Sequence, residues 1–425
     1  MLFFKNLLVI MLDIFKRYSG LTRFTTIFIV LYSVYYLPWD LGSPLGPIKT
    51  ILTFAIIVVM LFYCFHVSKA LIIGTVYLLW QYLVASYHPE SFRWSTLIFS
   101  AMLVYTYVAF YNLITIERVF TIEHFIKICK WIMMAYFVVC IIHQVLIIVG
   151  VNSLPVINHI YLGRGLGCYS LSLEPSAFGR FMLVFYYAYV KCCEYKRDEG
   201  PFTLRELFSG EHKWVTVRFL WMMLTMGSGT AFVCLILFSL YFVRWHNWYY
   251  IIPALIIGYS LIQASGIEAL DRATSTIEAT TTLNKDIVRE TDVSASVRVT
   301  PILNSITADF TKSETWLGYG IDAGIKDKYN RTLFDDYGFV FYLISLLLCF
   351  TCGYSFFSLG TIFMFAGVGG GAGGNIQYAW ALMMVMTCVR YFYKNRYSPE
   401  IYEIEEEYNN KLYPNNSCPI QEQFY

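Results

Sequence analysis

The sequence predicts an all-α, polytopic integral membrane protein with about 12 transmembrane helices. Hydrophobic residues make up 57% of the 425 positions and charged residues only 14%, and the mean hydropathy is +0.54. A soluble domain cannot bury so much apolar surface. Crossing the hydrocarbon core takes roughly 20 mainly apolar residues, and segments of this kind follow one another along most of the chain.

Each predicted span is an apolar run bounded by polar or turn-forming residues. In chain order the spans are residues 21–38, 47–66, 70–87, 93–115, 131–150, 173–193, 214–227, 229–243, 248–264, 336–352, 354–368 and 376–393. The spans at 214–227 and 229–243 are the shortest pair, and a small-residue stretch at 227–230 separates them. They form either two short helices or one long tilted helix.

The positions of Lys and Arg predict the orientation. Basic clusters precede the first span, lie between the fourth and fifth spans and between the sixth and seventh, and follow the last. Twelve spans place all of these clusters in the cytoplasm, together with both termini and the tail 394–425. Merging 214–243 into one span would move the basic end of the tail outside, so the rule favours a break at 227–230.

The chain then reads as one membrane domain, 1–425, with two outer loops at 151–172 and 265–335. The longer loop is rich in Thr and Ser, and its charges are balanced. Its apolar positions predict helices that pack back onto the bundle: Ile277, Leu283, Ile287 and Val288. The net charge of +2 and the lack of a basic arm argue against nucleic acid as a partner.

The 11 cysteines predict no disulfide framework. Most lie in apolar segments, and the CxxC of Cys349 and Cys352 falls inside a span, so these residues read as small apolar side chains. Cys168 is placed alone in an outer loop. Phosphate-loop and zinc-ligand patterns are missing, and we therefore expect neither a metal nor a cofactor.

Ionisable residues gather at residues 163–180, where an outer loop meets a span. Arg164, Glu174 and Arg180 lie there, and charges at such depth are costly enough to indicate function. Arginine grips phosphate bidentately, and a carboxylate serves as a general base. Together, without a metal, they suit group transfer from a phosphate leaving group, and at a membrane face the natural donor is a lipid diphosphate.

Each of these residues also has a structural explanation. Arg164 snorkels to lipid headgroups in one alternative. Glu174 caps the helix that starts at Pro175, a role that is compatible with catalysis. Arg180 lies about two turns into the span, where an internal ion pair with Glu174 competes with a diphosphate contact.

Residues 173–179 (LEPSAFG) resemble the carboxylate-Pro-Ser signature of O-antigen and capsule repeat-unit polymerases of the Wzy type, in the O-antigen polymerase/ligase superfamily. Further matching elements cover roughly residues 150–355: the Gly-Arg element at 163–165, the small-residue break at 226–230, SVRV at 296–299, WLGYGI at 316–321 and DDYGF at 335–339.

The resemblance implies a metal-independent glycosyltransferase of GT-C architecture with a large periplasmic loop. Such an enzyme moves a glycan from undecaprenyl diphosphate onto the next lipid-linked repeat unit. The implied location is the bacterial inner membrane, with the active site facing the periplasm. The implied partners are the undecaprenyl-diphosphate-linked oligosaccharide, membrane lipid and a chain-length regulator.

On this basis the catalytic residues are Glu174, Arg298 and Arg164, and the residues that bind diphosphate or glycan are Arg180, Arg289, Tyr319 and Arg331. Arg298 has an alternative as a structural partner of Asp292 or Asp309. Arg289 and Arg331 have an alternative as solvated surface charges.

Two other functions share the topology. An O-antigen ligase typically carries a histidine in the large outer loop, and no His follows His246 here. A flippase for lipid-linked oligosaccharides does not need a 70-residue outer loop, and no inverted repeat typical of transporters is visible.

Overall fold

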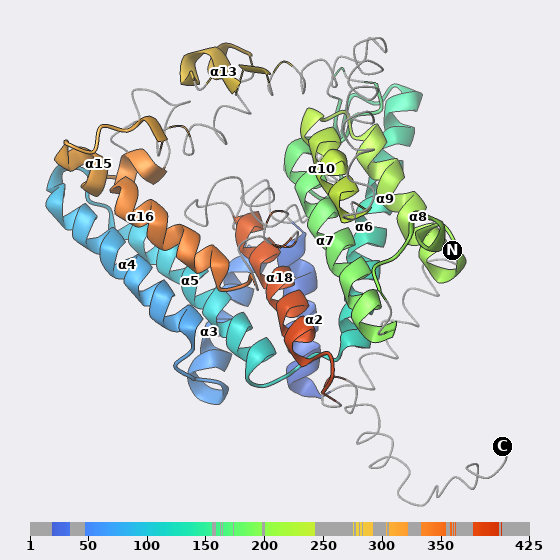
Figure 1. Cartoon of the computed structure of the whole chain (residues 1–425), viewed down its shortest axis with the longest axis horizontal. Coiled ribbons are helices and arrows are strands. Elements are labelled where there is room, and N and C mark those ends of the chain that lie inside the picture. Colours follow the sequence, from blue (N-terminus) through green and yellow to red (C-terminus); the bar gives the residue numbers. More distant parts are fainter. Residues whose placement is uncertain are drawn as a thin grey trace, which may run out of the picture.

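The computed structural model describes residues 19–34, 47–154, 159–161, 163, 165–172, 174–197, 200–242, 275, 278–279, 281–282, 284–291, 303, 306–321, 333–353, 358, 360, 362, 377–398 and 401. These residues are mostly helical, and the long helices stand side by side in one bundle (Figure 1). The predicted span 248–264 lies outside the described residues, as do most of the span 354–368 and most of the tail.

The described part of the first half of the chain forms helices, of which α3 to α6 follow one another with short connections. They are α2 (Gly20–Ser33), α3 (Pro47–Tyr63), α4 (Lys69–Tyr87), the 3-10 turn η1 (Pro89–Ser91), α5 (Trp94–Thr115) and α6 (Ile122–Val149). α6 begins nine residues before the predicted boundary at 131. The Thr121 side chain accepts a hydrogen bond from the His124 N–H, and Glu123 lies in the first turn, so a capped helix start outweighs the polar residues around it.

The second half contains one long helix, a helical hairpin and several shorter elements. They are α7 (Pro175–Arg197), α8 (Leu204–Leu207), η3 (Gly210–His212), α9 (Lys213–Thr225), α10 (Gly229–Ser239), η4 (Leu240–Phe242), α13 (Lys285–Thr291), α15 (Ser313–Leu317), α16 (Leu333–Phe350) and α18 (Gln377–Asn395). The loop 151–172 also holds a small antiparallel sheet, β1 (Ser153–Leu154) with β2 (His159–Ile160), which the all-α prediction did not include.

The predicted break at 227–230 is confirmed. α9 ends at Thr225 and α10 begins at Gly229, with Gly227 between them at φ 68°. The two helices form a hairpin, because the rings of Phe219 and Phe238 lie 5.7 Å apart and both pack on Tyr186.

In the part of the chain that the structure describes, three helices are long and apolar enough to cross a membrane: Lys69–Tyr87, Trp94–Thr115 and Ile122–Val149. α3 and α4 also expose apolar stripes at helical spacing, for example Ile72, Val76, Leu79 and Leu83 on α4, each at least 45% exposed. Such surfaces are compatible with contact to lipid. The fold is thus compatible with a membrane protein, and the count of about 12 spans stays a prediction.

α7 packs against α6, α9, α10 and α18. Nearly its whole length is buried, including the charged residues Arg180 and Glu194. Because protein rather than lipid surrounds α7, it can carry charged side chains that a lipid-facing helix excludes. This burial among other helices also explains why its sequence is less apolar than that of its neighbours.

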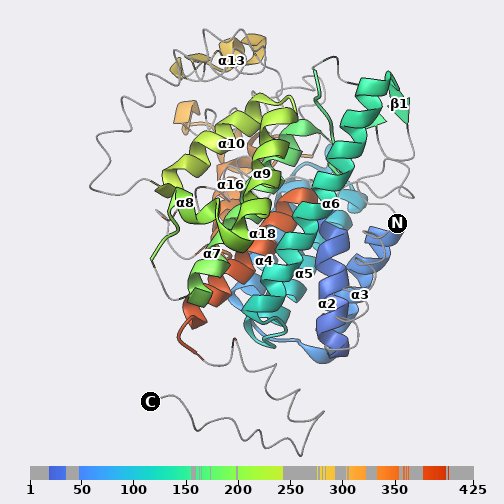
Figure 2. The same ribbon diagram turned by 90° about the vertical axis from the view of Figure 1, so that its right-hand side faces the viewer.

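The segments of both predicted outer loops lie at one end of the molecule. β1 and α13 are at the top in Figure 2, and the end of α18 points to the bottom. α6 reaches this upper end because its 28 residues span about 42 Å, which exceeds the roughly 30 Å of a hydrocarbon core.

The described residues of the loop 265–335, from which helices were expected to pack back onto the bundle, include α15, which packs on α16, and α13. Val288 is buried with Ala279 and Leu303 in a small cluster separate from the main core, and Ile287 is 42% exposed. Among the described residues around α13, these three apolar side chains cover one another. Ile277 and Leu283 lie outside the described residues.

Candidate functional site

The site is built around the first turn of α7. Pro175 is the first helical residue, and the Glu174 carbonyl accepts the Phe178 N–H at 3.0 Å, so Glu174 stands at the helix start as expected for a cap. Its side chain is 42% exposed. The carboxylate lies at the positive end of the α7 dipole, which favours a negative charge there.

Arg180 lies directly beneath this carboxylate. Its side chain is only 2% exposed, and its Nη2 lies 3.5 Å from Glu174 Oε1. Its Nε donates to the Ser176 carbonyl at 3.2 Å, while the Ser176 hydroxyl donates to the same Glu174 Oε1. The internal ion pair considered for Arg180 is therefore confirmed, and this ion pair and the Ser176 hydrogen bond on one oxygen orient the carboxylate.

The segment before Glu174 is held against α6. The Ser170 hydroxyl donates to the Tyr136 carbonyl at 2.6 Å, and the Tyr136 hydroxyl donates to the carbonyls of Ser33 at 2.8 Å and Leu171 at 3.4 Å. The Tyr136 ring also stacks on Phe178, with centroids 5.5 Å apart. One tyrosine thus ties the end of α2, the outer segment and the start of α7 to the same point on α6.

The residue that follows the small-residue break at 226–230, Ala231, makes a close helix contact with α7. A Cβ added at Gly179 would sit 3.2 Å from the Ala231 Cα, so α10 approaches the α7 backbone directly. Only glycine permits this approach without a shift of α10.

Two motifs of the large outer loop touch each other. The N–H of Tyr319 donates to the Asp335 carbonyl at 2.8 Å, and the N–H of Gly320 donates to the Asp336 carbonyl at 3.0 Å. A Cβ at Gly338, where φ is 79°, would lie 2.1 Å from the Trp316 carbonyl oxygen. The Gly-aromatic-Gly and Asp-Asp-x-Gly stretches therefore form one clasp between α15 and the start of α16.

This clasp is anchored to α4 and lies away from Glu174. The Gln81 side chain donates to the Tyr337 hydroxyl at 2.9 Å, and the Trp80 indole donates to the Tyr337 carbonyl at 3.3 Å. α15 and α7 stand on opposite sides of the molecule (Figure 1). The structure therefore does not bring Tyr319, which is 54% exposed, next to Glu174.

The remaining predicted arginines are not placed. Arg164, Arg298 and Arg331 lie outside the described residues, and Arg289 lies on α13 with its side chain undescribed. Asp309, one alternative partner of Arg298, lies 3.7 Å from Lys312 Nζ. Among the residues that are described, no group of three or more His, Cys, Asp or Glu side chains is arranged to hold a metal ion.

Sequence reasoning missed two buried features. Lys49 on α3 is fully buried. A signal for this was present in the sequence, because a lysine stands at the third position of an apolar span. The sequence also did not predict that Cys168 is buried with its Sγ 3.4 Å from Cys140 Sγ on α6, although both thiols are free, as expected. A contact between a loop and a helix 28 positions away leaves no periodic signal in the sequence.

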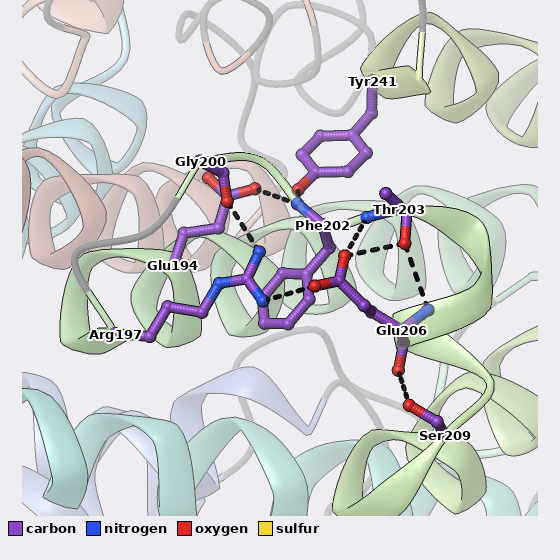
Figure 3. A network of polar contacts seen from close by, with 8 residues as sticks. All are labelled: Glu194, Arg197, Gly200, Phe202, Thr203, Glu206, Ser209 and Tyr241. Carbon is purple, nitrogen blue, oxygen red and sulfur yellow. Dashed lines mark hydrogen bonds and ion pairs between the residues drawn. The ribbon is translucent and has the colours of Figure 1, made fainter.

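A polar network joins the end of α7 to α8, within the connection that was assigned to the cytoplasm (Figure 3). Arg197 donates to Glu206 at 3.0 Å and to the Gly200 carbonyl at 2.6 Å, and its guanidinium stacks 3.7 Å from the Phe202 ring centroid. Thr203 and Glu206 form a capping box at α8. Hydrogen bonds from the Thr203 backbone and hydroxyl, and then from Arg197, lower the pKa of Glu206 to about 2.

Comparison with known proteins identifies no relative of the chain. No family model matches it, and neither a curated protein nor a solved structure matches it. The resemblance to repeat-unit polymerases therefore stays a prediction, and any functional inference depends on the geometry at the start of α7.

Proposed function

We propose that the chain is a repeat-unit polymerase of the Wzy type, a GT-C-type glycosyltransferase of the bacterial inner membrane. It joins undecaprenyl-diphosphate-linked oligosaccharide repeats into O-antigen or a related surface polysaccharide on the periplasmic face. The observation that supports this proposal is the half-exposed Glu174 carboxylate at the start of the buried helix α7, oriented by Ser176 and the buried Arg180.

In the proposed reaction, a hydroxyl of the incoming repeat unit attacks the anomeric carbon of the growing glycan. The Glu174 carboxylate accepts the hydroxyl proton. The bond between the anomeric carbon and the diphosphate oxygen breaks, and undecaprenyl diphosphate leaves with the electron pair. Arginine side chains stabilise the negative charge that develops on the leaving group, so the reaction takes place without a metal.

The residues have different roles in this proposal. Arg180 is a positioning residue, because its buried guanidinium is turned toward Glu174 and Ser176. Arg164 and Arg298 contact the diphosphate, with Arg289 and Arg331 as further cations. Tyr319, which lies far from Glu174, contacts a more distant sugar of the glycan. A chain-length regulator is the proposed protein partner.

The electrophoretic profile of surface glycan from cells that lack the chain tests this function. We expect a lipid A core that carries a single repeat unit, because repeats are still made, flipped and ligated. The electrophoretic ladder of longer glycans should be absent. A core without any repeat would instead favour an O-antigen ligase or a flippase. An unchanged ladder would exclude a role in that polymer.

A further inference from the structure

Two thiols from different parts of the chain meet beside the start of α7. Cys140 lies on α6, and Cys168 lies in the segment that leads to Glu174 six residues later. Their Sγ atoms are 3.4 Å apart, and both side chains are buried. A disulfide needs a separation of about 2.05 Å, so the two sulfur atoms have to approach by only a little more than 1 Å.

Neighbouring contacts hold the two thiols in register. One helical turn before Cys140, Tyr136 receives the Ser170 hydroxyl through its carbonyl and donates its own hydroxyl to the Leu171 carbonyl. The segment therefore runs antiparallel to α6, with 168 beside 140 and 170–171 beside 136. The contact between the two thiols therefore forms when the whole segment docks on α6 in this register.

A histidine pair covers the thiols on the outer side. His143 is fully buried one turn beyond Cys140, and its ring packs 5.1 Å from that of His159. The hydrogen bond between the two thiols, and then the interaction with the His143 imidazole, lower the pKa of the Cys168 thiol against the opposing effect of burial. The thiolate is the form of cysteine that reacts in thiol–disulfide exchange.

We propose that Cys140 and Cys168 form a disulfide that staples the outer segment to α6. This inference rests on the proposed orientation, in which the segment faces an oxidising compartment. The oxidant is a disulfide-carrying oxidoreductase of that compartment. Cys168 thiolate attacks one sulfur of the oxidant disulfide and releases the other as a thiolate. Cys140 thiolate then attacks Cys168 Sγ and releases the second oxidant sulfur, so the oxidant becomes a dithiol.

The staple has a defined consequence for the site. Both thiols are buried in the folded protein, so the exchange takes place while the segment is still docking onto α6. Once formed, the bond prevents residues 165–172 from leaving α6 and thereby limits the positions that Glu174 can adopt. The disulfide positions the site and takes no part in the transfer chemistry.

The test reads the state of the thiols in the full-length protein. Intact cells are treated with N-ethylmaleimide before lysis, so that free thiols are blocked. The protein is then purified and digested without reductant. Mass spectrometry is used to search for the peptide that links Cys140 to Cys168. In parallel, polyethylene glycol maleimide counts free thiols before and after reduction. We expect the linked peptide, and a gain of two thiols on reduction in the wild type and in Cys234→Ala, a variant of another buried cysteine.

Cys140→Ala and Cys168→Ala should each show no gain of thiols on reduction. If neither variant accumulates, the linked peptide from the wild type decides alone. Absence of that peptide would overturn the proposal. If reduced, purified protein then forms the bond with oxidised glutathione, the pair faces a reducing compartment and the proposed orientation is wrong as well. A linked protein that fails to polymerise glycan would contradict the proposed function and leave the disulfide supported.

Discussion

The ion pair between Glu174 and Arg180 should respond unequally to the loss of either partner. The guanidinium is 2% exposed, whereas the carboxylate is 42% exposed. Glu174→Gln leaves the buried Arg180 guanidinium without the Glu174 carboxylate as its ion-pair partner. Arg180→Met leaves a carboxylate that water still reaches and that keeps the Ser176 hydroxyl.

The expected losses follow from this difference in exposure. Breaking a buried ion pair from one side costs roughly 3–5 kcal/mol, and the low end, about 3 kcal/mol, applies to Glu174→Gln because half of the pair is solvated. For Arg180→Met we expect about 1 kcal/mol, since exposed carboxylates gain little from a partner. The double variant should be no less stable than Glu174→Gln alone, because it no longer buries the charge.

The measurement is the free energy of unfolding of the purified protein in one detergent at neutral pH. Glu211→Gln is a matched control, because this carboxylate pairs with Lys130 at the surface and is 71% exposed. Its loss should stay below about 1 kcal/mol. Equal losses for the two site variants, or a larger loss for Arg180→Met, would refute the assigned burial and with it the positioning role of Arg180.

Three further predictions concern other parts of the molecule. Because the pKa of Glu206 is lowered from 4.5 to about 2, its contribution is full above its ordinary value and is lost as the pH falls toward about 2. Thermal melts of Glu206→Gln between about pH 5 and about pH 3 should therefore fall less steeply than those of the wild type, and an equal slope would count against the capping box. Gly179→Leu should lower the free energy of unfolding by about 1–3 kcal/mol, because the side chain forces α10 away. Gly20→Leu should leave the free energy of unfolding unchanged, because a Cβ added there has nothing within 4 Å. Equal effects of the two substitutions would contradict the close helix contact. Reduction of the Cys140–Cys168 bond, which closes a loop of 29 residues, should lower the free energy of unfolding by about 2–4 kcal/mol, and a melt insensitive to reductant would argue against the staple.

Much of the helical framework was predictable from apolar runs. α5 was expected at 93–115 and lies at Trp94–Thr115, and α7 was expected from 173 and begins at Pro175. These runs succeed because an interior or lipid-facing helix has to be apolar over most of its length. The start of α6 was missed, because the polar residues of its first turns hide a helix start that the Thr121 cap defines.

The site was predictable only in its local part. Glu174, Pro175 and Arg180 lie within one helical start, so their proximity follows from helix geometry. The contact of Cys168 with Cys140 and the clasp between Tyr319 and Asp335 join segments that no periodicity relates. Burial of Lys49 depends likewise on which helices surround α3, and a single sequence does not state this.

The central claim is that the Glu174 carboxylate, at the start of α7, acts as the base when repeat units are polymerised. The most direct test is the surface-glycan profile of cells in which the wild-type chain is replaced by Glu174→Gln or by the control Glu211→Gln. The two variants are compared at matched protein levels in the membrane. We predict that Glu211→Gln restores the full ladder and that Glu174→Gln leaves a core with a single repeat. A full ladder from Glu174→Gln would contradict the claim.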